Sequence, residues 1–445
     1  MMNTTIYSGD IINNTTTEKK NNNNNNDDDD NDQKSSFVVL GDAFADLVCH
    51  LDGPFPKEAG GDTRLEHPIT TMAGGSGLNT CTHLCSLVSA AELLGRQTVS
   101  LYTAVNESDP YGMLLCNHAQ EQGFDLHNCH PDASNSSTGH CAVLVANGER
   151  SFLTHLGVME TFEARHIDTG RLTLSSSNQK MLFVHVAGYY NIPGFWDGAL
   201  KRTLQTIIQT KMKEGGGGGG GGDNKNLVTS LLCQYDATEA WDGQLMDLLP
   251  LIDYLFCNEV EVEKIAQATT MKSQSQESPS SLSSSQQHQQ VESSCMEDLD
   301  SDDESYWIDM ARFFQTTSPS TCVIVTLGPK GALALYGGQI LARQEAPTSV
   351  ENPLDPTGAG DAFISGFLYG LFVVPVAAAA TADSLLEDSD TATATASKVV
   401  PSRKESVQQA LQYGCAVGTS CISRMGASNP APRGEIDELM KKYHS

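Results

Sequence analysis

The sequence has few basic residues for the number of its acidic ones. It holds 27 lysines and arginines against 55 aspartates and glutamates, which gives a formal net charge of −28. A nucleic-acid surface needs a stripe of basic side chains, so this balance argues against a nucleic-acid partner. Any phosphate group that the protein binds must therefore be held by local donors, helix ends and metal ions rather than by overall charge.

Membrane and secretory features are also absent. No run of eighteen apolar residues occurs, so no membrane span is expected. The amino terminus is polar rather than apolar, unlike a secretory signal. The 12 cysteines include no Cys-x-x-Cys pair, and their scatter through apolar segments is typical of buried free thiols in a reducing compartment. These absences predict a cytoplasmic protein.

Polar and low-complexity stretches make up much of the 445 residues. Residues 1–35 contain runs of asparagine and aspartate and predict a disordered tail. Flexible insertions are expected at about 214–224, which holds an uninterrupted glycine run, at about 272–305 and at about 377–403. Without these stretches roughly 300 residues remain, the size of one large α/β domain, which we assign to 36–445.

Short apolar runs that end at a glycine or a polar residue predict buried parallel strands. They lie at 37–41, 98–104, 181–186, 227–232, 252–257 and 321–327, and a further hairpin is expected at 332–342. The pattern predicts a three-layer α/β/α domain with a mainly parallel central sheet. Weak alternation at about 49–72 and a hairpin at 137–156 predict a small β-lid over a substrate, although the hairpin is equally explained as a packing or dimer surface.

One stretch combines an extended segment, a glycine turn and a helix that starts on an acid: Leu354 to Phe363, with the sequence LDPTGAGDAF. Gly358 and Gly360 allow a ligand to approach the backbone closely. The helix expected from Ala362 has unpaired N–H groups and a positive dipole at its start, which favour an anion. Asp361 stands beside that site, where a carboxylate can accept the proton of a hydroxyl that attacks a phosphate. The alternative is an ordinary helix N-cap.

Other polar residues follow predicted strands. Asp46 comes shortly after the first strand, at the edge where open α/β sheets bind ligands, and an acid there can accept hydrogen bonds from sugar hydroxyls. Asn258 and Glu261 lie three apart at a helix start, where they suit either a hydrated Mg²⁺ or a capping box. A second glycine turn, 74–79, leads into a helix. Neither glycine turn has the spacing GxGxxG, and no GxxxxGK[ST] occurs, so neither standard dinucleotide nor P-loop motif is supported.

Together these segments resemble the PfkB family of carbohydrate kinases, the ribokinase-like proteins. The stretch 355–363 fits the carboxy-terminal motif of that family without departure, and Gly74-Gly75-Ser76-Gly77-Leu78-Asn79 resembles its amino-terminal motif. Asn258-Glu259-Val260-Glu261 fits its Asn-x-x-Glu motif, and Thr326 to Gly331 resembles the nucleotide-binding turn that follows. The motifs occur in the order of the family. The resemblance implies a ribokinase-like fold and an ATP-dependent sugar kinase.

The resemblance also implies a role for each matching position. Asp361 would be the general base on the sugar hydroxyl, and Gly358, Ala359 and Gly360 would form the anion hole. The residues implied to hold the sugar are Asp46, Gly74, Gly75 and Asn79. The residues implied for ATP and Mg²⁺ are Asn258, Glu261 (through water), Thr326 and Gly328. Asp355 and Thr357 resemble the monovalent-cation loop of ribokinases. The resemblance therefore implies K⁺ as a further cofactor of this protein, although not every member of the family uses potassium.

Three departures bear on the substrate. Ribokinase-type members have Lys where this chain has Ser76, Asn where it has Phe44, and a sugar-binding Glu where Val186-Ala187-Gly188 stands. They leave open which sugar is phosphorylated. A nucleoside kinase of the adenosine type is the alternative enzyme, and a non-catalytic sugar-binding relative is the alternative class. The intact glycine turn and Asp361 favour an enzyme, and a homodimer through the lid is an option.

Overall fold

The structure, a computed structural model, describes residues 34–443 apart from 56–61, 91–96, 131–135, 147–148, 175–178, 215–226, 277–303, 348–352 and 374–402. Most of the expected tail and of the three expected insertions thus lies outside the described residues. Residues 272–276 continue a helix, residues 304 and 305 begin another, and Arg403 starts a third.

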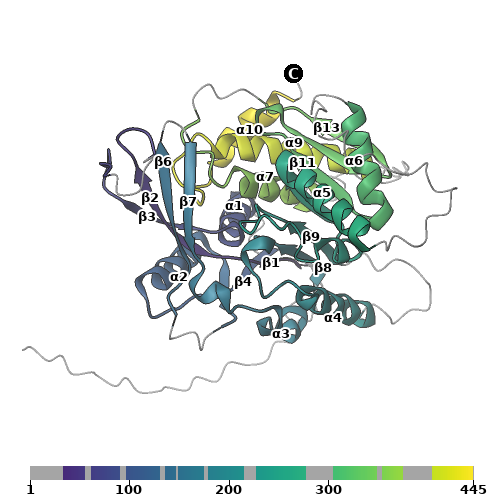
Figure 1. Cartoon of the computed structure of the whole chain (residues 1–445), viewed down its shortest axis with the longest axis horizontal. Helices are drawn as coiled ribbons and strands as arrows, with labels where there is room; N and C mark the ends of the chain where they lie inside the picture. The colour runs from purple at the N-terminus through teal and green to yellow at the C-terminus, as the bar shows by residue number, and fades with distance from the viewer. Residues whose placement is uncertain are drawn as a thin grey trace, which may run out of the picture. The chain divides into compact units, whose positions relative to one another are not determined.

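Within the described residues, nine strands form a central sheet in the order β13-β12-β11-β10-β9-β8-β1-β4-β5 (Figure 1). All neighbours from β11 to β5 pair in parallel, whereas β12 and β13 are antiparallel at one edge. The prediction of a mainly parallel sheet with a terminal hairpin is confirmed. The strands are β1 (Lys34–Leu40), β4 (Gln97–Thr103), β5 (Asp125–Asn128), β8 (Gln179–Val186), β9 (Leu227–Leu232), β10 (Tyr254–Asn258), β11 (Cys322–Thr326), β12 (Ala332–Tyr336) and β13 (Gln339–Gln344).

Strand β1 shows why these apolar runs form central strands. Val38 and Leu40 pack into the core on one face of the sheet, and Phe37 and Val39 pack into the core on the other. A strand covered on both faces needs apolar side chains at successive positions, so its sequence is a continuous apolar run rather than an alternating one.

Helices cover both faces of the sheet, which confirms the three-layer prediction (Figure 1). One layer contains α1 (Ser76–Ala90), α2 (Pro110–Gln122), α7 (Ala359–Leu368), α9 (Arg403–Cys421) and α10 (Arg433–Lys441). The other contains α3 (Thr169–Leu174), α4 (Ala199–Glu214), α5 (Glu259–Gln276) and α6 (Glu304–Thr317). No helix among these described segments is long and apolar enough to cross a bilayer.

A second sheet forms the lid, in the order β3-β2-β6-β7. Its strands are β2 (Phe44–His50), β3 (Thr70–Gly74), β6 (His140–Ala146) and β7 (Glu149–His155). The expected hairpin at 137–156 is confirmed, with its turn at 147–148 outside the described residues. The first lid strand begins at Phe44, not at residue 49, because β2 pairs with β6 from Ala45 onward. Asp46 therefore lies on the lid and not on a loop of the central sheet.

Candidate active site

Helix α7 places Asp361 at the carboxyl edge of the central sheet. The helix begins at Ala359 rather than at the expected Ala362, because Gly358 adopts a left-handed backbone (φ 75°) and serves as its N-cap. A side chain at Gly358 would also collide with Ala427, since an added Cβ would lie 2.6 Å from the Ala427 Cβ. Asp361 thus stands in the first turn of the helix, where the sequence predicted an anion site.

Two side chains from α1 hold the Asp361 carboxylate. The Ser76 hydroxyl donates to Oδ1 at 2.6 Å, and the Asn79 amide donates to Oδ2 at 2.8 Å. Asn79 Oδ1 in turn accepts from the Ser428 hydroxyl at 2.5 Å, which fixes the orientation of the amide. The Asp361 residue is 6% exposed. The second glycine turn therefore brings its helix start to the base, and Asn79, expected to hold the sugar, contacts Asp361.

Burial raises the pKa of Asp361 from its ordinary 3.8 to about 7. The hydrogen bonds from Ser76 and Asn79 lower this pKa, and the nearby charges of Asp42 and Glu261 raise it. Desolvation outweighs the hydrogen bonds because the charged form loses its hydration. A carboxylate with a pKa near neutrality is well matched to accept a proton at the working pH of a cell.

The turn before α7 leaves backbone donors accessible to an anion. Ala362 donates to the Gly358 carbonyl at 2.8 Å, which is the first hydrogen bond of the α-helical type. The N–H groups of Gly360 and Asp361 come before this first hydrogen bond, and the first N–H groups of a helix have no carbonyl acceptor within the helix. A Cβ added to Gly360 would meet no atom of the protein within 4 Å. The space beside Gly360 is thus open, as the predicted anion hole requires.

The lid contributes a second carboxylate. Asp46 on β2 lies opposite Met72 on β3, and its carboxylate overlaps the space that a side chain at Gly74 would need. Gly75, with φ 91°, approaches the backbone of Ala43 and Phe44 in the same way. Burial, together with the smaller effect of the charges of Asp42, Asp355 and Asp361, raises the pKa of Asp46 to about 7. The expected sugar-binding glycines therefore support the Asp46 carboxylate in this structure.

A third carboxylate, Asp42, is fully buried at the end of β1. It accepts the backbone N–H of Gly77 at 3.0 Å and the Asn191 amide at 2.8 Å, and Asn191 also donates to Gln234 at 2.8 Å. Burial raises the pKa of Asp42 despite these donors. Asp42 lies shortly before Asp46 in the sequence. The residues around Asp42 do not indicate whether it is an active-site aspartate or an ordinary loop aspartate.

On the nucleotide side, Asn258 and Thr326 are register partners at the carboxyl ends of β10 and β11. Asn258 and Glu261 form a reciprocal capping box: the Glu261 N–H donates to Asn258 Oδ1 at 2.8 Å, and the Asn258 N–H donates to Glu261 at 2.9 Å. Gly328 opens the following turn with φ 53°, and a Cβ there would meet nothing within 4 Å. The four residues expected to serve ATP are therefore near one edge of the sheet.

Glu261 is compatible with Mg²⁺ held through water. Burial raises the pKa of Glu261 to about 7, and the charge of Glu261 contributes to the raised pKa of Asp361. Within the part of the chain that the structure describes, no three acidic, histidine or cysteine side chains form a ready metal site. A hydrated Mg²⁺ bound to phosphates needs only one or two carboxylates, so Glu261 is sufficient for such a site.

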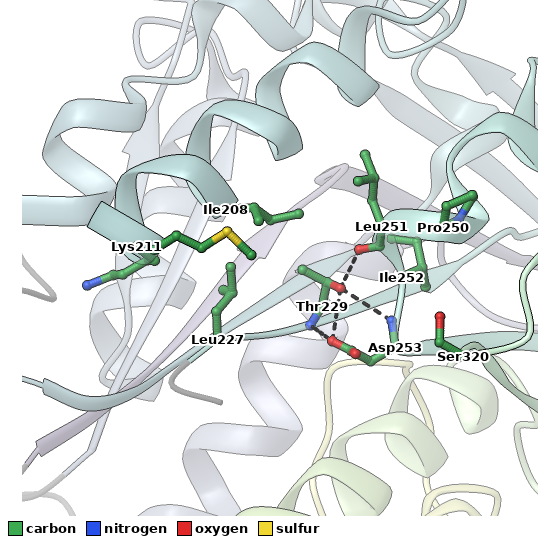
Figure 2. A pocket seen from close by; sticks show the side chains of 10 residues that line it. Ile208, Lys211, Leu227, Thr229, Pro250, Leu251, Ile252, Asp253 and Ser320 are labelled. Carbon is green, nitrogen blue, oxygen red and sulfur yellow. Dashed lines mark hydrogen bonds between the residues drawn. The ribbon is translucent and has the colours of Figure 1, made fainter. Parts of the chain in front are cut away.

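The cavity in Figure 2 lies at the opposite end of the sheet, with a volume of about 190 Å³. It is lined by residues at the amino ends of β9 and β10, whereas the site residues follow the carboxyl ends. Thr229 bonds to other residues of the lining: its N–H donates to the Asp253 carboxylate at 2.8 Å and its hydroxyl donates to the Leu251 carbonyl at 2.5 Å. This cavity belongs to the structural part of the domain.

A buried aspartate in the first helical turn after a glycine turn, close to a lid strand with a second carboxylate, fits a phosphotransferase of ribokinase-like fold. The chain belongs to the pfkB family of carbohydrate kinases, whose profile matches residues 34–433.

The chain is similar to known kinases of two kinds. It is 22% identical over 303 residues to adenosine kinase 1 of Arabidopsis thaliana, over 67% of this chain and 72% of that protein. The ribokinase of Giardia lamblia superposes with a TM-score of 0.61 at 19% identity, covering 92% of this chain and 99% of the other. The A. thaliana ribokinase solved with ribose and ATP gives 0.54 at 18% identity, with the same coverage. These identities show the fold and leave the acceptor open.

Proposed function

We propose that the protein transfers the γ-phosphate of ATP to a hydroxyl group of a sugar. Asp361 takes the proton of the acceptor hydroxyl while its oxygen attacks the γ-phosphorus, and the bond to the β–γ bridging oxygen breaks to release ADP. The N–H groups at the start of α7 stabilise the charge on the transferred phosphoryl group. Mg²⁺, held through water at Glu261, would neutralise phosphate charge when bound.

The observation that carries this proposal is the environment of Asp361. The residue is buried at the amino end of a helix, has a pKa raised to about 7, and is oriented by Ser76 and Asn79. An aspartate that served only as a helix cap would gain nothing from burial that favours its neutral form. A base that must accept a proton near neutral pH does gain from it.

The residues proposed to bind the phosphate acceptor favour a polyhydroxylated molecule. Asp46 provides acceptor oxygens for sugar hydroxyls from the lid, above the glycine turn that holds Asp361 in place. Charged acceptors bind hydroxyl groups more strongly than neutral ones do. A sugar bound between Asp46 and Asp361 would place a hydroxyl at the base.

A nucleoside is the second candidate acceptor, favoured by the similarity to adenosine kinase 1 and by one aromatic group. The polar chain from Asp42 through Asn191 leads to Gln234, and the next residue, Tyr235, is 51% exposed. Its ring packs edge-on against Trp241 at 5.1 Å. An exposed ring next to amide groups can stack on a base, so the sugar of a nucleoside would take the place proposed for a free sugar.

The test is a panel of free sugars and nucleosides assayed with Mg-ATP for ADP release. Asp361→Asn should lower kcat by roughly 10²-fold or more on the acceptor that the wild type phosphorylates. Asp309→Asn is the matched control, because Asp309 is exposed on α6 in a surface ion pair with Arg312. Its rate should match that of the wild type. An Asp361→Asn variant as active as the control, or a wild type inactive on every acceptor, would contradict the proposal.

The cellular setting and the assembly of the protein remain predictions of this proposal. The cysteines that the structure describes are free thiols, most of them buried, which supports a reducing compartment such as the cytoplasm. Phe152 and Leu153 on β7 are 55% and 63% exposed, which supports a homodimer through the lid. Light scattering of Leu153→Lys beside the wild type would test the dimer, since a charge there should favour the monomer.

A further inference from the structure

An arginine from the lid is paired with the aspartate that opens the phosphate-binding turn. Arg150 lies on β7, and one of its guanidinium nitrogens is 2.8 Å from Asp355 Oδ1. The two side chains are 12% and 7% exposed, so this is a largely buried ion pair and little screened by solvent. It joins the lid to a turn that belongs to the central domain, across a long separation in sequence.

The Asp355 carboxylate is engaged on both oxygens. Oδ1 also accepts the N–H of Thr357 at 2.8 Å, and Oδ2 accepts the N–H of Gly426 at 2.9 Å. The backbone of the same turn pairs with the loop after α9, where Leu354 donates to the Ile422 carbonyl at 2.8 Å. Asp355 therefore holds two loops together and carries its negative charge beside the N–H groups proposed to bind phosphate.

A monovalent cation at Asp355 and Thr357, expected from the resemblance to ribokinases, does not fit this arrangement. A cation would need the carboxylate oxygen that Arg150 and the Thr357 N–H already occupy, and it would stand next to a fixed guanidinium charge. Like charges so close together repel strongly where little water screens them. The positive charge at this position is already supplied by the protein itself.

We propose that the guanidinium group of Arg150 acts in place of a monovalent cation, so that phosphoryl transfer by this protein does not depend on K⁺. The charge neutralises Asp355 and lets the turn before α7 accept an anionic phosphate. Because Arg150 lies on the lid strand β7, its positive charge is next to Asp355 when the lid lies against the turn. Arg150 is thus a positioning residue that acts through Asp355. Its effect on the rate rests on the proposed kinase activity, whereas the ion pair and its effect on stability do not.

The experiment compares the wild type with Arg150→Ala in choline chloride and in KCl at equal ionic strength. Wild-type kcat should change by less than about twofold between the two salts. Arg150→Ala should lose about tenfold or more in choline chloride, and K⁺ or added guanidinium ion at millimolar concentration should restore at least about fivefold. Arg165→Ala is the matched control, since Arg165 pairs with Glu163 at the same 2.8 Å but on the surface. It should respond to neither cation.

A second measurement needs no acceptor and no activity. The Tm of Arg150→Ala should fall by about 5 °C in choline chloride, because a buried carboxylate loses its partner, and it should rise in KCl as the cation binds the folded state. The Tm of the wild type should be the same in both salts to within about 1 °C. Circular dichroism establishes that the variant is folded.

The outcomes of these two experiments decide whether Arg150 acts in place of a monovalent cation. A wild type strongly activated or stabilised by K⁺ would overturn the proposal, as would an Arg150→Ala variant as fast as the wild type without K⁺. A slow variant that no cation restores would also overturn it, because Arg150 would then act only as a mechanical link. If no acceptor is phosphorylated at all, the kinase proposal fails and the Tm comparison still tests the ion pair.

Discussion

Replacing Ser76 with alanine should move the acid limb of the pH–rate profile to higher pH. The Ser76 hydroxyl donates to Asp361 Oδ1 at 2.6 Å in a buried environment. It stabilises the charged carboxylate, so it lowers the pKa that burial has raised to about 7. Without this donor the carboxylate holds its proton to higher pH, and the enzyme needs a higher pH to reach the same fraction of ionised base.

The size of the shift follows from the strength of the hydrogen bond. A hydrogen bond to a charged group contributes about 1.5–3 kcal/mol, against about 1 kcal/mol for a neutral one. The difference of about 0.5–2 kcal/mol corresponds to about 0.4–1.5 pKa units, about one unit at the middle of the range, since each unit is 1.36 kcal/mol. The acid limb should therefore move from about pH 7 to about pH 8. The rate at full ionisation should fall less than the rate at low pH.

The assay is kcat/KM between about pH 5.5 and 9 for the wild type, Ser76→Ala and Ser365→Ala. Ser365 is the matched control because it is also buried beside Asp361 but donates to the carbonyls of Thr80 and Asp361 rather than to the carboxylate. Its midpoint should stay within about 0.3 units of the wild type. A Ser76→Ala profile that falls equally at every pH, with no change of midpoint, would refute the role of Asp361 as the titrating base.

The other predictions concern stability and the phosphate site. Asp361→Asn should raise the free energy of unfolding by about 4 kcal/mol near pH 8, because the carboxyl group ionises near 3.8 in the unfolded chain and near 7 in the folded one, and each pKa unit corresponds to about 1.36 kcal/mol. Near pH 4 the substitution should change that free energy by almost nothing, and urea unfolding at both pH values tests this. Gly360→Ala should keep the wild-type Tm and lose about tenfold or more in kcat, whereas Gly358→Ala should lower the Tm, because only Gly358 has φ above zero and a crowded Cβ position. An equal fall in Tm for both would contradict this difference. Glu261→Gln should weaken the response to Mg²⁺ about tenfold relative to Glu263→Gln on the same helix, as a Mg²⁺ titration would show, and equal responses would argue against Glu261 at the metal.

Local signals in the chain predicted the frame of the site. Apolar runs bounded by glycine or polar residues marked the parallel strands, because a strand buried on both faces is mostly apolar. The turn at 355–361 is recognisable because proline restricts the backbone, glycine permits the left-handed conformation of a tight turn, and a helix follows within a few residues. The errors at element ends, such as the start of α7 at Ala359, reflect N-cap geometry: the left-handed Gly358 starts the helix before the apolar pattern does.

Contacts between residues far apart in the sequence could not be predicted from the sequence, for a physical reason. Ser76 was recognised only as a departure at a motif position, and its contact with Asp361 spans much of the sequence. The role of Arg150 is not predictable from the sequence, because an arginine on a hairpin is usually solvated. Nothing near it in sequence marks Asp355 as its partner. The position of Asp46 on a lid strand is not predictable from the sequence, because the pairing of β2 with β6 cannot be seen from β2 alone.

The amino-acid sequence by itself determined the three-layer α/β/α fold, the glycine turn and the identity of Asp361 as the candidate base, since strand burial and turn geometry depend on neighbouring residues. Only the tertiary structure decided how that base is tuned and what neutralises Asp355. The pKa of Asp361 depends on burial and on donors from α1, and the charge on Asp355 is met by an arginine from the lid. Electrostatics act through space, so residues distant in the chain set the chemistry of this site.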